Sequence, residues 1–144
     1  MNRNPRGFTM IELMIVIAVL SILVLIAYPA YDSFVTRTRR SEAKRELLAL
    51  ATAQERYFTN CNAYAAALDG SQANCTGLGG GTATRITENG HYEISLAGGG
   101  TAYALTATPR GVQANDSTCG NFTLTDTGAK SVSGSGTVDS CWPR

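Results

Sequence analysis

A long apolar run with a single acid near its start constrains this chain more than any other feature. Between Phe8 and Tyr31, Glu12 is the only side chain expected to be charged. A helix of about 20 apolar residues can cross a bilayer, and the stretch from Phe8 to Ala27 reaches that length. A carboxylate inside such a span costs on the order of 3 kcal/mol and needs a partner. A functional hypothesis must therefore explain Glu12.

Three interpretations of this start compete. A cleaved secretory signal would use Arg3 and Arg6 as its charged region, but the apolar run is too long and the nearest small-residue cleavage site, at Ala27, is poor. A plain single-span anchor explains the length of the run but leaves Glu12 unexplained. In the third interpretation, cleavage falls before the run, after Gly7, and the apolar helix stays on the mature protein.

The third interpretation matches a known family. The segment Gly7-Phe8-Thr9-Met10-Ile11-Glu12 resembles the class III signal of type IV pilins and the related pseudopilins. The resemblance implies that a prepilin peptidase cuts between Gly7 and Phe8 and methylates the new N-terminus of Phe8. It also implies that Glu12 meets the N-terminus of a neighbouring subunit during assembly. Residues 1–7 would then be a leader peptide.

Elementary electrostatics agrees with this assembly role for Glu12. A carboxylate and an amine each stabilise the charged form of the other, and Glu12 would lie about one helical turn from the new amine of Phe8. Such a pair fixes register, because misaligned packing leaves a buried charge unpaired. We expect Glu12→Val to insert normally and to assemble poorly. The alternative is a carboxylate that is merely tolerated near the membrane edge.

The charge balance excludes a general nucleic-acid binder. The 144 residues carry 12 basic and 11 acidic side chains, a formal charge of +1. Loss of Arg3 and Arg6 with the leader would leave 10 basic against 11 acidic side chains, which is not the footprint of a DNA-coating protein. We also expect no enzyme activity and no cofactor, because His91 has no nucleophile in a recognisable motif.

Metal binding is not predicted either. The acids Asp116, Asp126 and Asp139 fall in loop segments, where turn and capping roles are usual. A calcium site, as in the major pseudopilins of type II secretion, is an alternative, but no compact acid-rich loop supports it.

The four cysteines all follow the apolar run, at Cys61, Cys75, Cys119 and Cys141. None forms a C-x-x-C pair and His91 is remote in sequence, which argues against zinc. An even number of cysteines in a translocated domain predicts disulfides in an oxidising compartment. Three pairings exist in principle. The pairing that closes only short local loops, Cys61–Cys75 with Cys119–Cys141, is favoured. The second pair resembles the C-terminal disulfide loop of pilins.

The remaining pattern predicts an α+β chain. Leu47, Leu50 and Phe58 recur at helical spacing, so an amphipathic helix over residues 32–59 should continue the membrane and assembly helix of residues 8–31. Pro29 should kink this long helix, because proline lacks the amide donor. Residues 60–90 read as a glycine-rich connecting loop. Residues 91–144 read as three or four short antiparallel strands in a meander with a disulfide-closed C-terminal loop.

A basic segment follows the apolar run: Arg37, Arg39, Arg40, Lys44 and Arg45. Counted simply, these charges favour the opposite membrane orientation. The disulfides and the resemblance place the C-terminal part outside the cytoplasm, and we follow them. A solvated face, or pairing with acids on neighbouring helices, is the favoured role of the segment. Contact with DNA during uptake is the alternative, because some minor pilins are DNA receptors.

The sequence therefore predicts a type IV pilin, most like the PilE-like minor pilins. That finer resemblance rests on residues 54–58 and 103–109, on Cys119-Gly120 and on Cys141-Trp142. The precursor would span the inner membrane once with a periplasmic C-terminal domain, then join an extracellular pilus, the fimbrium, that supports adhesion, twitching motility and, as an alternative role, DNA uptake. Its partners would be other pilin subunits, the prepilin peptidase/methyltransferase and the inner-membrane assembly machinery. The alternatives are a pseudopilin of type II secretion or a membrane-anchored periplasmic binding domain with an uncut start.

Overall fold

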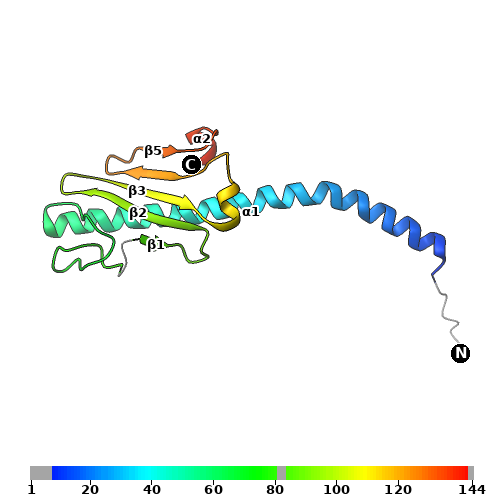
Figure 1. Cartoon of the computed structure of the whole chain (residues 1–144), viewed down its shortest axis with the longest axis horizontal. Coiled ribbons are helices and arrows are strands. Elements are labelled where there is room, and N and C mark those ends of the chain that lie inside the picture. The colour runs from blue at the N-terminus through cyan, green and yellow to red at the C-terminus, as the bar shows by residue number, and fades with distance from the viewer. Residues whose placement is uncertain (1–7, 81–83, 143–144) are drawn as a thin grey trace, which may run out of the picture. The chain divides into compact units, whose positions relative to one another are not determined.

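The longest element of this chain is one helix of 52 residues near its start. The computed structural model describes residues 8–80 and 84–142, with the backbone alone described at residues 29 and 30. Helix α1 runs from Met10 to Cys61 (Figure 1). The chain divides into two compact units, residues 1–35 and 36–144, and α1 contributes to both.

The first unit is an apolar helix with exposed side chains. Thr9 precedes α1, and the amide of Leu13 donates to its carbonyl at 3.2 Å. Length and composition make this helix long and apolar enough to cross a membrane. The hydroxyl of Ser21 donates to the carbonyl of Ile17 at 2.7 Å, so this polar group is satisfied inside the apolar stretch. The backbone of Pro29 belongs to α1.

The second unit contains one antiparallel sheet in simple meander order. Its strands are β1 (Thr84–Ile86), β2 (Tyr92–Gly99), β3 (Ala102–Pro109), β4 (Phe122–Thr125) and β5 (Lys130–Val132). Each strand pairs with the next along the chain. Figure 1 shows β2 and β3 lying over the second half of α1.

Side-chain alternation fixes the register of the central strands. Alternate residues are buried in the first half of β2, in β3 and in β4, and Leu105 of β3 faces Leu96 on one side and Leu124 on the other. A slip of one residue would turn the apolar side chains to solvent, so this register is strongly specified.

The second half of α1 buries one stripe of side chains against the same core. Ala43, Leu47, Leu50 and Tyr57 belong to this stripe. Gln54 lies in the stripe too, fully buried, and its amide exchanges two hydrogen bonds with the backbone of Ala65, at 2.9 and 3.0 Å. This polar pair anchors the segment after α1 to the helix.

The structure confirms the predicted fold class and differs in detail. The sheet has five strands rather than three or four, because β1 lies inside the segment expected to be a connecting loop. All three residues of β1 are exposed, so it lacks the alternation that reveals a strand. Phe58, expected in the core, is 37% exposed, at the C-terminal end of α1.

Two disulfides close two separate local loops. Cys61 pairs with Cys75 and Cys119 with Cys141, the pairs that the spacing favoured. The second bridge connects the segment after the 3-10 helix η1 (Gly111–Asn115) to the short helix α2 (Val138–Cys141).

Candidate functional site

The start of α1 is built as a capped helix terminus. The hydroxyl of Thr9 accepts a hydrogen bond from the amide of Glu12 at 3.3 Å. Threonine before the helix with glutamate three residues later is the capping-box pattern, and an acid in the first turn also complements the helix dipole. Sequence reasoning treated Glu12 as an assembly residue and overlooked this cap, although the Thr-x-x-Glu spacing was its signal.

The other residues expected at the processing site are only partly visible. Phe8 lies ahead of α1 with its side chain 81% exposed, and Glu12 is exposed as well. Gly7 and the leader residues Arg3 and Arg6 lie outside the described residues.

Large apolar side chains surround α1 on every side in the first unit. Ile11, Leu13, Met14 and Leu23 are each at least 56% exposed, although they point in different directions around the helix. An apolar surface this extensive is a partner surface, because soluble monomers rarely expose more than a few hundred Å² in one patch. Its partner is either lipid or other apolar helices.

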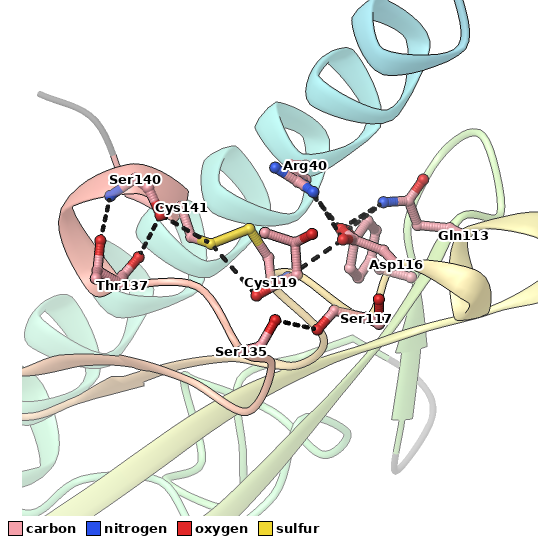
Figure 2. Close-up of polar contacts among 11 residues, drawn as sticks. Arg40, Gln113, Asp116, Ser117, Cys119, Ser135, Thr137, Ser140 and Cys141 are labelled. Atoms are coloured by element: carbon pink, nitrogen blue, oxygen red, sulfur yellow. Dashed lines mark hydrogen bonds and ion pairs between the residues drawn. A yellow bond between two sulfur atoms is a disulfide. The ribbon is translucent and has the colours of Figure 1, made fainter. Parts of the chain in front are cut away.

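The second unit, residues 36–144, is called the head from here on. It contains a buried ion pair that the sequence did not reveal. Arg40 of α1 donates two hydrogen bonds to the carboxylate of Asp116, both 2.7 Å long (Figure 2). The Asp116 side chain is 2% exposed and that of Arg40 15%. Asp116 also accepts from the amide of Cys119 and from the side-chain amide of Gln113, each at 3.2 Å. One carboxylate therefore links α1, η1 and the C-terminal disulfide.

These contacts determine how Asp116 titrates. Burial raises the pKa of Asp116, but the hydrogen bonds from Arg40 and Cys119 together with the charge of Arg40 outweigh burial and hold that pKa below 3.8. The pair is therefore charged at neutral pH.

The C-terminal segment, residues 133–142, folds back onto Thr118 and Cys119. The amides of Gly134 and Gly136 donate to the carbonyls of Cys119 and Thr118, at 3.1 and 2.7 Å. Thr137 caps α2 by accepting from the amide of Ser140 at 3.2 Å (Figure 2). Trp142 is buried, and its indole donates to the carbonyl of Ser131 in β5 at 3.3 Å. This tail therefore covers the β5 edge of the sheet.

The basic segment of α1 is split between two flanks of the helix. Arg37 and Lys44 line a cleft of about 560 Å³, together with Arg40, Thr118 and Ser140. A second cleft, of about 310 Å³, lies on the other flank. It is lined by Thr38, Arg39, Ser41, Glu42, Arg45, Asn89 and His91. The residues of the basic segment therefore do not share one face of α1.

The second flank is fixed by another buried acid. Glu42 is 8% exposed and accepts the amide of Asn89 at 3.0 Å. Burial raises the pKa of Glu42, but hydrogen bonds from Thr87 and Asn89 outweigh it and leave that pKa below 4.5. The turn between β1 and β2 is thereby attached to α1.

Within residues 8–80 and 84–142, no cluster of three His, Cys, Asp or Glu could hold a metal ion.

An exposed apolar helix at the start, an antiparallel meander on its continuation and a disulfide-closed tail together define a pilin-like class of protein. The prokaryotic N-terminal methylation motif matches residues 2–28. The family described as "Type IV minor pilin ComP, DNA uptake sequence receptor" matches residues 29–123, about two thirds of the chain. The chain belongs to this family. It is a type IV pilin, and its family is not one of enzymes.

Individual relatives match less than half of this chain. The type IV major pilin PilA of Myxococcus xanthus is 49% identical over 63 residues, 44% of this chain and 29% of that protein. A fimbrial protein of Pseudomonas aeruginosa is 50% identical over 53 residues, 37% of this chain and 34% of that one. PilE1 of Neisseria gonorrhoeae is 54% identical over 43 residues, 30% of this chain and 26% of that protein. The matches thus span about a third of these curated relatives, or less.

One solved structure resembles this chain only loosely. A type IV pilin from Shewanella oneidensis has a TM-score of 0.48 and 20% identity, covering 66% of this chain and 89% of that one.

Proposed function

We propose that this chain is a minor subunit of a type IV pilus. In this proposal it is cut between Gly7 and Phe8, methylated on Phe8, and polymerised with other pilin subunits through α1. The observation that carries the proposal is the exposed apolar surface around α1, with Glu12 at its start. The prepilin peptidase and the inner-membrane assembly machinery are the partners that this route requires, and the inner membrane holds the precursor with its head in the periplasm.

The proposal gives Glu12 a role beyond helix capping. A buried carboxylate and the amine of Phe8 in a neighbouring copy satisfy each other, and mismatched registers leave one of them unpaired. Glutamine at the same position keeps the capping-box pattern but carries no charge. The two roles can therefore be separated by substitution.

We predict that Glu12→Val and Glu12→Gln both reduce surface filaments at least tenfold while the precursor still inserts and is cut. The measurement is the yield of sheared filaments, with the mass of the mature N-terminus determined in parallel. Thr9→Ala serves as the control for the cap, and should lower yield far less. Normal filaments from Glu12→Gln would reduce Glu12 to a helix-capping residue. An intact Met1 in filaments would overturn the whole proposal.

Capture of DNA for uptake is the finer role that we propose for this subunit. Its support is the family match over residues 29–123, whose description names a DNA uptake sequence receptor. Arg39 and Arg45 lie on one flank of α1, and the side chain of Arg45 is 69% exposed, with only a 3.9 Å contact to the exposed Glu88. Exposed pairs of this kind contribute little, so Arg45 is open to phosphate groups.

We predict that the detergent-solubilised full chain binds duplex DNA with an affinity that falls steeply with salt. Replacing Arg45 with glutamine should weaken binding about equally for all sequences and lower the slope of log K against log salt by about 1. Arg56→Gln, at an exposed site further along α1, is the matched control. Binding that is undetectable or indifferent to salt would leave a structural subunit without DNA capture. A filament confined to the periplasm would favour a pseudopilin.

A further inference from the structure

Two cations in the cleft beside the C-terminal disulfide, Arg37 and Lys44, form no ion pair among the described residues. Arg40 beside them is paired with Asp116. Burial, and then the charge of Arg40, lower the pKa of Lys44. The cleft therefore holds positive charge that the described head leaves uncompensated.

The charges in this cleft add up to a small excess. Arg40 and Asp116 cancel, and Asp139 in the first turn of α2 opposes one of the two remaining cations. An excess of one positive charge is left. Hydroxyls of Ser41, Thr118 and Ser140 line the same cleft and can donate further hydrogen bonds. This is a site for one anionic group that enters from outside the chain.

An acidic group of matching kind lies on the opposite flank of α1. Glu88 belongs to the turn between β1 and β2, and its side chain is 85% exposed. The turn is attached to α1 through Asn89 and Glu42, two residues before Lys44 along the helix. Glu88 and the cleft therefore lie at nearly the same level along α1, within about one helical turn.

We propose that Glu88 of a second copy of this chain enters the cleft between Arg37 and Lys44. The proposal rests on polymerisation of this chain. Copies arranged around a filament axis meet through heterologous contacts, in which two different flanks of the same molecule face each other. One flank of α1 has one uncompensated positive charge and the other presents one exposed carboxylate, so the two flanks are complementary.

Duplex DNA suits this cleft less well. Proteins that bind DNA through its phosphates neutralise roughly 6–10 of them to gain strong affinity. The cleft offers an excess of a single charge and includes Asp139, which repels a polyanion. One carboxylate matches this site better than a phosphate backbone.

The test uses a property of the sequence: its only lysines are Lys44 and Lys130. A carbodiimide joins an amine directly to a carboxylate in contact with it, so filaments of the full chain should yield multimers linked from Lys44 to Glu88. Lys44→Arg keeps the charge and should abolish these multimers. Lys130→Arg, on β5, is the matched control and should leave them unchanged. Wild-type filaments whose multimers contain no Lys44–Glu88 linkage, identified by peptide mass, would overturn the proposal.

A charge exchange provides the second measurement. Lys44→Glu should lower filament yield at least about tenfold, as expected for a lost interfacial charge pair, and adding Glu88→Lys should restore most of it. Failure of the second change to restore yield would count against the pairing. Normal filaments with reduced duplex capture in Lys44→Glu would assign the cleft to DNA and overturn the proposal. Absence of wild-type filaments would instead refute the proposed polymerisation.

Discussion

At the scale of single residues, Asp116 holds the head together through one carboxylate. It receives four hydrogen bonds, from Arg40, Cys119 and Gln113, while its side chain is almost fully buried. Breaking a buried pair by removing one partner is costly, because the other charge stays buried without compensation. If Asp116 lost its charge, Arg40 would stay buried without a compensating negative charge.

We predict that Asp116→Asn lowers the free energy of unfolding of the head by about 3 kcal/mol at pH 7. The pKa of Asp116 in the folded chain lies below 3.8, so its contribution is complete well above that pH and is lost as pH falls through the folded pKa. The difference between wild type and variant should therefore shrink in strong acid. Fluorescence of Trp142, the only tryptophan, reports unfolding of the full chain in detergent.

Asp139→Asn is the matched control for that measurement, because Asp139 is exposed and should change stability by less than about 0.5 kcal/mol. Equal losses for the two variants would show that the buried pair does not stabilise the head.

At the scale of elements, the C-terminal segment is shaped by glycines that lie against another backbone. A Cβ at Gly134 would collide with the carbonyl of Thr118, and one at Gly136 would lie 2.8 Å from the same oxygen. The backbone of Gly134 has no positive φ, so crowding alone requires glycine there. Residues 133–136 can therefore approach Thr118 and Cys119 only because positions 134 and 136 have no side chain.

We predict that Gly134→Ala destabilises the head by about 2 kcal/mol, within the usual range for an overpacked site. Ser135→Ala, at the exposed neighbouring position, should have little effect, since it removes only a 3.4 Å contact to Ser117. Urea unfolding followed through Trp142 compares the two variants. An equal, small effect at both positions would mean that the segment relaxes freely.

Sequence patterns predicted some elements far better than others. The alternation of Tyr92, Ile94 and Leu105 revealed β2 and β3, because one face of those strands is buried. Strand β1 has no such face, so only its pairing with β2 defines it. The basic segment was expected to be solvated or to pair with acids on neighbouring helices, yet Arg40 turns toward Asp116, which is 76 residues away in sequence. Pairings over such distances leave no periodic signal in the chain.

At the scale of the whole molecule, the chain carries two kinds of unpartnered surface. Apolar side chains surround α1 in the first unit, and complementary charges lie on the two flanks of α1 in the second. Apolar contact supplies non-directional attraction, whereas a buried charge pair penalises wrong registers. A filament built from such copies would draw its cohesion from the first surface and its alignment from the second.

The two disulfides also set how this protein responds to mechanical tension. A load applied along α1 and transmitted through the head could extend the backbone only where no covalent loop bypasses it. The bridges span sequence separations of 14 and 22 residues. The two closed loops correspond to roughly 50 and 75 Å of extended chain. This length cannot be pulled out by the load, even when the sheet of the head has unfolded. Each subunit would act as a tether of limited extensibility.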